Sequence, residues 1–236
     1  YLKAQGVYEN TIFIVTSDNG AEASGPDDPS QFSSSRMAQS LGYHQDYERL
    51  GLKGSYSSIG PSFASAAASP LAFYKFYAGE GGMRVPLIVT GVAVAQATSI
   101  THAFSWVTEI TPPVLSLAGV EQPGSRYAGK PVLPISGKSL VPLLNGSASR
   151  VYGPEDSVGY ELTGHAAFFQ GDYKIVRNLL PMGDGQWRLH NIATDPGEVE
   201  DLSEAQTERF QRMLAGYAQF EKDNRVMALP EGYSQA

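Results

Sequence analysis

Two adjacent oxygen-donating side chains follow the first apolar run of this chain. Asp18 and Asn19 come directly after Thr11–Thr16 (T-I-F-I-V-T), and Gly20 follows them. A carboxylate and an amide oxygen are hard donors, which suit Ca²⁺ or Mg²⁺ better than Zn²⁺. The alternative is a turn or helix cap in which Asp18 accepts backbone hydrogen bonds, and S-D-N-G is common turn chemistry. The pair is therefore a candidate metal site that the residue types alone do not separate from a turn.

A lysine and a glycine-rich segment form the second candidate. Lys75 precedes Glu80-Gly81-Gly82, and Arg84 follows in a position to pair with Glu80. An ammonium group in a cleft beside a metal can neutralise an anionic substrate or the charge that builds on a leaving oxygen. The glycines would let the loop pass close to a bound group. The alternative is a solvated surface lysine followed by a turn, because most lysines are exposed.

Other residues with reactive side chains carry weaker signals. The histidines are too far apart in the sequence to form an i, i+4 metal pair, and only His44 lies in a loop that could reach a site. The segment Gly60–Ala64 (G-P-S-F-A) has a distant likeness to a nucleophile elbow but follows no convincing strand. Asp195–Glu198 (D-P-G-E) and the acids after it are interpreted as a turn and the acidic first turn of the final helix.

The first 150 residues predict part of an α/β domain. Thr11–Thr16 and Val85–Val89 are continuous apolar runs, typical of strands buried on both faces of a helix-covered parallel sheet. Ala23–Ala68 is interpreted as a long loop with one short helix, and such loops are usually functional. Helices are predicted at Phe104–Leu117 and Ser139–Leu144, where apolar residues have helical spacing or turn formers follow.

Residues 151–236 predict a small α+β subdomain. Four short strands separated by turn residues predict an antiparallel meander: Val158–Leu162, Ala166–Gln170, Tyr173–Arg177 and Trp187–Asn191. Leu202–Lys222 predicts an amphipathic helix that covers this sheet. The expected division is therefore 1–150 for the larger α/β part and 151–236 for the small subdomain.

The composition excludes several classes of function. Among 236 residues, 24 Asp and Glu outnumber 17 Lys and Arg, and the basic residues are scattered, so no nucleic-acid partner is expected. No apolar run reaches the roughly 18–20 residues of a membrane span. There is no cysteine, which excludes disulfides, thiolate catalysis and cysteine-ligated zinc.

Taken in order, segments along nearly the whole chain resemble successive blocks of the sulfatase family, closest to the bacterial arylsulfatases of the alkaline-phosphatase-like superfamily. These segments are N-T-I-F-I-V-T-S-D-N-G-A-E, Y-K-F-Y-A-G-E-G-G-M-R-V-P-L-I-V, T-E-I-T-P-P-V-L-S-L-A-G-V, G-D-Y-K-I-V-R-N and W-R-L-H-N-I-A-T-D-P-G-E-V-E-D-L. The resemblance implies an α/β fold with a large mixed sheet and a small C-terminal four-stranded antiparallel sheet with a covering helix. It also implies hydrolysis of small-molecule sulfate esters. The composition predicts a soluble protein, and the sequence does not decide between the bacterial cytoplasm and periplasm.

The same resemblance assigns roles to three residues. Asp18 and Asn19 match the family's Ca²⁺ ligands, and Lys75 matches the lysine that contacts the sulfate, which makes it both substrate-binding and catalytic. The family's nucleophile is a formylglycine made from the first residue of a C/S-x-P-x-R motif, and this sequence contains no such motif. Glu109 is a smaller departure, because the family usually has Asp there, and we expect only structural consequences.

These departures predict that the chain is the C-terminal portion of an enzyme roughly twice as long. Its partner would be the N-terminal half of the same enzyme, with the formylglycine and the remaining metal ligands. The portion alone is expected to be inactive. Two alternatives stay open: a sulfatase-like scaffold or binding protein without catalysis, and a related hydrolase of phosphate or phosphonate esters.

Overall fold

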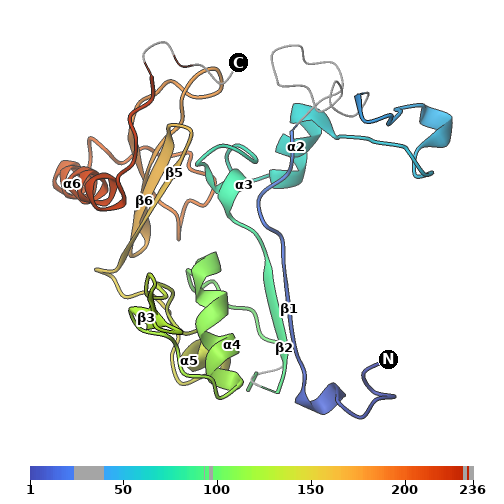
Figure 1. The fold of residues 1–236 in the computed structure, drawn as a ribbon. Helices are drawn as coiled ribbons and strands as arrows, with labels where there is room; N and C mark the ends of the chain where they lie inside the picture. The colour runs from blue at the N-terminus through green and yellow to red at the C-terminus, as the bar shows by residue number, and fades with distance from the viewer. Residues whose placement is uncertain (24–39, 93, 96–97, 231–232, 234–236) are drawn as a thin grey trace. The chain divides into compact units, whose positions relative to one another are not determined.

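The computed structural model describes residues 1–23, 40–92, 94–95, 98–230 and 233, and contacts group the chain into two compact units. The first unit comprises Tyr1–Thr16 and Pro86–Asp156, and the second Ser17–Val85 and Ser157–Ala236. The elements of the first unit are η1 (Tyr8–Asn10), β1 (Ile12–Thr16), β2 (Leu87–Gly91), η3 (Val107–Ile110), α4 (Thr111–Leu117), β3 (Arg126–Tyr127), β4 (Lys130–Pro131) and α5 (Val141–Leu144). Those of the second unit are η2 (Tyr47–Arg49), α2 (Gly60–Ala68), α3 (Glu80–Met83), β5 (Ser157–Leu162), β6 (His165–Gln170), β7 (Tyr173–Arg177), β8 (Arg188–Asn191) and α6 (Thr207–Asn224) (Figure 1).

The two apolar runs of the first unit form one antiparallel ribbon. β1 and β2 pair in a register that sets Ile14 opposite Val89 (Figure 1). Both strands were predicted, but the burial expected on both faces is wrong within the described residues. Val15 and Ile88 are each 59% exposed. The reason is that β1 and β2 pair only with each other in the part of the chain described.

The helix predicted at Phe104–Leu117 begins later than its apolar spacing suggested. A 3₁₀ turn, η3, leads into α4, whose first turn contains Pro112 and Pro113. Buried Glu109 organises this start, because its carboxylate accepts hydrogen bonds from the Trp106 N–H and from the hydroxyl of Tyr152 at 2.7 Å. Its role in the described residues is therefore structural, as expected.

The second unit contains the predicted four-stranded antiparallel meander. Its strands lie in the order β5-β6-β7-β8, with Phe168 opposite Ile175 and Ile175 opposite Leu189. Residues directly opposite one another on paired strands point to the same face of a sheet, so these three residues lie on one face. The α/β class and the small C-terminal sheet are thus both present.

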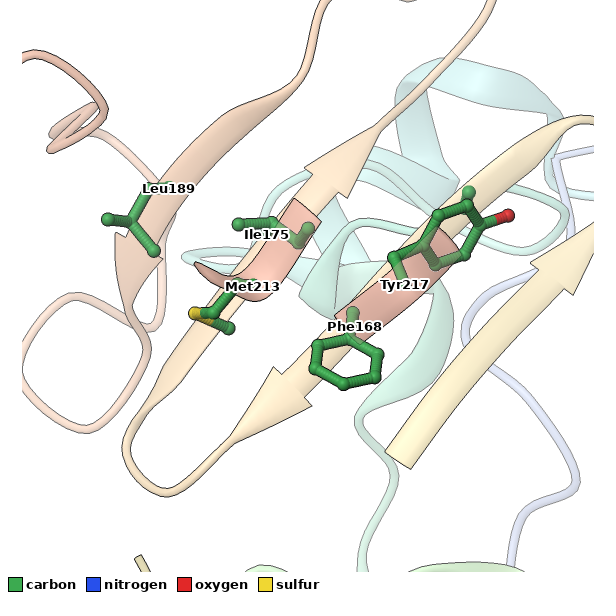
Figure 2. Close-up of a cluster of buried hydrophobic side chains, with 6 residues drawn as sticks. Phe168, Ile175, Leu189, Met213 and Tyr217 are labelled. Carbon is green, nitrogen blue, oxygen red and sulfur yellow. The ribbon is translucent and has the colours of Figure 1, made fainter. Parts of the chain in front are cut away.

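Helix α6 covers that face of the sheet. Figure 2 shows Met213 and Tyr217 of the helix among Phe168, Ile175 and Leu189 of the strands, and all five belong to one buried cluster. The helix starts at Thr207 and not at the predicted Leu202. Leu202 lies in the loop before the helix, where its N–H donates to the carbonyl of Leu189 on β8. The predicted apolar face of the helix is confirmed.

The sheet begins at Ser157, close to the predicted boundary at residue 150, but the division of the chain into domains at that boundary stays a prediction. Among the described residues, no helix has the length and apolar character needed to cross a membrane.

We predict that Met213→Ala lowers the free energy of unfolding by about 2–5 kcal/mol, because removal of a fully buried side chain leaves a cavity under α6. Chemical denaturation of the complete protein measures this value. Gln211→Ala on the exposed side of the same helix is the control and should change stability by less than about 0.5 kcal/mol. Equal losses in the two variants would contradict this packing.

Candidate functional site

The two predicted metal ligands lie in the turn that follows β1. The Ser17 hydroxyl donates to the Asn19 carbonyl at 2.9 Å, which closes the turn. Asp18 is exposed, and within the described residues its carboxylate makes no hydrogen bond or ion pair. The structure therefore does not use the Asp18 side chain as the cap or Asx turn that the alternative interpretation required.

Backbone contacts fix this turn against the glycine-rich segment. The Gly20 N–H donates to the Gly82 carbonyl at 2.9 Å, and a Cβ added to Gly20 would overlap the Gly81 carbonyl. A Cβ on Gly81 would likewise overlap the Phe73 carbonyl. These glycines allow backbone to pack on backbone, and Glu80–Met83 forms the short helix α3. Their expected approach to a bound group stays a prediction.

Lys75 lies beside the same turn. Its N–H donates to the Ala21 carbonyl at 3.0 Å, and its ammonium lies 2.6 Å from the Glu22 carboxylate. The lysine side chain is 32% exposed, so it is neither free in solvent nor buried. The structure thus places Lys75 next to the segment that carries Asp18 and Asn19.

The backbone that carries Lys75 is strained on both sides. Phe73 and Phe76 have φ values of 64° and 80°, in the left-handed region that large side chains rarely adopt. Such residues cost about 1–3 kcal/mol each and persist where their surroundings determine the conformation. Here the surroundings are a buried cluster that includes Tyr74 and Tyr77, with Phe73 packed against it.

A buried group of charges lies next to α3. The Lys174 ammonium on β7 is fully buried, 3.0 Å from the Glu80 carboxylate and 2.8 Å from that of Glu198. Arg84 pairs with Glu80 at 2.6 Å, which confirms the predicted pairing. Two carboxylates share two cations in this group, so each buried charge has a partner. We call these four residues the Lys174 network.

The sequence interpretation missed most of this network. Glu198 is predicted only as part of a turn, but its side chain is 3% exposed and pairs with Lys174. The acids after it do not form the first turn of the final helix, because α6 begins at Thr207. Lys174 stands in the apolar strand Y-K-I-V-R, where a charged residue reads as an outward-facing position. The one available signal was that a lysine between apolar neighbours needs an acidic partner if it is buried.

The network shifts the pKa values of Glu80 and Lys174. Burial would raise the pKa of the Glu80 carboxyl, but the charges and hydrogen bonds of Lys174 and Arg84 outweigh burial, so this pKa lies below its ordinary value. Burial would lower the pKa of Lys174, but Glu198 and Glu80 outweigh it, so that pKa is raised. Both pKa shifts favour the charged forms of Glu80 and Lys174 at neutral pH.

The weaker candidates have structural roles in the described residues. His165 accepts the Leu179 N–H at 3.1 Å, and His190 lies 2.7 Å from the Glu200 carbonyl, so both are packing residues. His44 pairs with Ser55 in an isolated bridge. Ser62 lies inside helix α2 and follows no strand, which excludes the elbow geometry.

Asp18 and Asn19 fit a cation site only as part of a larger ligand set. They supply oxygen donors, as Ca²⁺ prefers, but Ca²⁺ takes about six to eight oxygens. No group of three or more His, Cys, Asp or Glu that could hold a metal is present in the part of the chain described. Residues 24–39 of the long loop lie outside the described residues.

Comparisons with known proteins identify relatives over nearly the whole chain. Residues 1–120 match a family model described as Sulfatase. An uncharacterized sulfatase of Schizosaccharomyces pombe is 29% identical over 234 residues, covering 99% of this chain and 42% of the relative. An arylsulfatase of Klebsiella aerogenes is 30% identical over 147 residues, covering 59% of this chain and 29% of the relative.

Solved structures share the fold at lower sequence identity. The structure of BT4656 in complex with its substrate, D-glucosamine-2-N,6-O-disulfate, has a TM-score of 0.58 and 20% identity. The match covers 99% of this chain and 38% of that chain. This chain therefore spans less than half the length of these relatives.

We predict that Lys174→Met lowers the free energy of unfolding by about 3–5 kcal/mol at neutral pH, because it removes the ammonium that neutralises the buried Glu198 carboxylate and leaves Glu80 to pair with Arg84. Chemical denaturation of the complete protein measures the change. The control is Lys138→Met, which removes a half-exposed pair with Asp156 and should cost at most about 1 kcal/mol.

The unfolding free energy that Lys174→Met loses should also become smaller as the pH falls. Because the folded-state pKa of Glu80 is depressed, its stabilisation is complete above the ordinary value of 4.5 and disappears as the pH falls through the lower folded-state value. In Lys174→Met the charge that lowers the pKa of Glu80 is removed, so the Glu80 carboxyl protonates more readily and the difference in unfolding free energy from the wild type narrows below about pH 4.5. A difference that is constant from neutral to acidic pH would contradict an ionised network.

Proposed function

This chain belongs to the sulfatase family, and we propose that the complete protein hydrolyses sulfate monoesters. The observation that carries the proposal is the fixed contact between the Asp18–Gly20 turn and the loop that carries Lys75. Oxygen donors for a cation and an ammonium group for an anion thus occur at one place in the fold. That combination suits an ester whose leaving oxygen and sulfuryl oxygens are negatively charged in the transition state.

Asp18 and Asn19 would hold part of the shell of one divalent cation, for which we propose Ca²⁺. When bound, such a cation supplies Lewis-acid stabilisation of sulfuryl oxygens. The other ligands would come from the N-terminal half of the same enzyme. The exposure of Asp18 supports this assignment, because within the described residues its carboxylate can coordinate a cation without breaking a contact.

Lys75 would bind the sulfate and stabilise charge as the S–O bond breaks. Its ammonium group can donate to an anionic oxygen, and its three N–H bonds allow it to do so while one still points to Glu22. The Glu22 carboxylate therefore acts as a holder that restricts the lysine side chain before substrate arrives. Since Lys75 remains 32% exposed, a small anion can reach it.

The nucleophile would lie outside this chain. The sequence contains no cysteine and no S-x-P-x-R, so the proposed formylglycine belongs to the N-terminal half, and this portion alone would not turn over substrate. The names of similar proteins include an arylsulfatase and a structure with a disulfated glucosamine substrate. We therefore propose a small-molecule sulfate ester, aryl or sugar, as the substrate class.

We predict that Lys75→Ala in the complete protein lowers turnover of para-nitrophenyl sulfate by about 10²–10³-fold, because an electrostatic stabiliser of the transition state is lost. The thermal unfolding midpoint should stay near that of the wild type. Lys130→Ala, an exposed lysine on β4, is the matched control and should retain activity.

Three outcomes of this assay would contradict the proposal. Near-normal turnover by Lys75→Ala would refute the role of the lysine. Faster hydrolysis of para-nitrophenyl phosphate than of the sulfate by the wild type would favour the phosphate-ester alternative. No hydrolysis of aryl or sugar sulfates by the wild type with an intact formylglycine would favour a scaffold without catalysis.

We predict that Asp18→Ala lowers the calcium retained by the complete protein, because one charged ligand of the cation is removed. Elemental analysis after dialysis gives the ratio of calcium to protein. Glu208→Ala, which removes an exposed carboxylate in the first turn of α6, should leave that ratio unchanged. Equal calcium content in the two variants would remove Asp18 from the metal site.

A further inference from the structure

Side chains next to the C-terminal sheet hold the backbone that follows Lys75. The Ala78 N–H donates to the Asn178 side-chain oxygen at 2.8 Å, and the Glu80 N–H donates to the Glu198 carboxylate at 2.8 Å. Asn178 follows β7, and Glu198 lies in the loop after β8. Both acceptors are buried, with Asn178 7% exposed and the Glu198 side chain 3% exposed, so water does not compete for these bonds.

The Lys174 network orients one of these acceptors. Lys174 lies between Glu80 and Glu198, so a single ammonium fixes both the carboxylate that accepts the Glu80 N–H and the side chain of Glu80 itself. Lys174 and Ile175 are neighbours on β7 and point to opposite faces of the sheet. Because Ile175 packs in the α6 core, the network lies on the other face, separate from the residues that hold the sheet together.

Lys75 is held on both sides by these contacts. The backbone N–H of Lys75 donates to the Ala21 carbonyl. Three residues later, the Ala78 N–H donates to the side-chain oxygen of Asn178. Phe76, with φ of 80°, lies between the two bonds. The Tyr77 ring also contacts the His165 ring on β6, with 4.8 Å between centroids. A strained segment held at both ends has little freedom to move its lysine.

We propose that Lys174, Asn178 and Glu198 are positioning residues for Lys75. They would raise kcat by holding the loop that carries the lysine, without contacting the substrate. This inference rests on the proposed function, because it needs Lys75 to act on the sulfate. Removal of a positioning bond lets the loop relax, and a misplacement of about 1 Å can cost about 10²-fold in rate.

The test is a double-mutant cycle between Asn178 and Lys75 in the complete protein. Asn178→Ala removes the acceptor of the Ala78 N–H and leaves all charges of the Lys174 network in place. It therefore avoids the loss of a buried cation that Lys174→Met causes. We expect kcat for para-nitrophenyl sulfate to fall about 10-fold or more. In the Lys75→Ala background the same substitution should change kcat by less than about twofold, because its effect passes through the lysine.

Matched variants separate positioning from loss of structure. Asn145→Ala removes an asparagine that accepts the Ser147 N–H at 3.0 Å in the first unit, and it should leave kcat unchanged. Glu198→Gln keeps an oxygen for the Glu80 N–H and should retain more activity than Glu198→Ala. Retained calcium in Asn178→Ala would show that the loss is not a loss of metal.

The outcomes distinguish the two proposals. If Asn178→Ala lowered kcat by the same factor in the wild type and in the Lys75→Ala background, the positioning role would be overturned. The proposed function would stay in place. Unchanged kcat in Asn178→Ala would also overturn the positioning role alone. Near-normal turnover by Lys75→Ala would overturn the role of the lysine, and the positioning role with it, while sulfate-ester hydrolysis would still stand. No hydrolysis of sulfate esters by the wild type would overturn the proposed function itself.

Discussion

The pairing of one buried lysine with two buried carboxylates is the constraint on which the second unit depends. Lys174 has no exposed surface, and an isolated charge in that position would cost several kcal/mol. Glu80 and Glu198 are therefore obligatory partners of the lysine and not optional surface charges. Since the first belongs to α3 and the second follows β8, the need to neutralise one ammonium joins the glycine-rich segment to the small sheet.

The geometry of the candidate site follows from that junction through backbone contacts. Once Glu80 is fixed, the neighbouring glycines bring Gly82 against Gly20, and Gly20 ends the turn that carries Asp18. Lys75 enters the same place through its bond to Ala21. Gly20 and Gly81, where an added Cβ would overlap a carbonyl, make this arrangement specific, because no other residue type fits the close approach.

Local patterns predicted the elements, and long-range contacts explain the misses. The four strands and the apolar face of α6 follow from period-two and helical spacing, and the family motifs identified Asp18 and Lys75 as candidates. Lys174 could not be assigned, because its partner Glu80 lies 94 positions away, and one charged residue in a strand looks solvent-facing. The burial expected for Thr11–Thr16 failed because an apolar run predicts a strand but does not provide the layer that covers it.

We propose that Asp18, Asn19 and Lys75 form the cation and anion part of a sulfate-ester site. The most direct measurement is a crystal structure of the complete protein with calcium and a sulfate or vanadate ion bound. We predict oxygens of Asp18 and Asn19 about 2.3–2.6 Å from the cation, and the Lys75 ammonium within hydrogen-bond distance of an anion oxygen. A cation and an anion bound together at a place that these three residues do not contact would contradict the account.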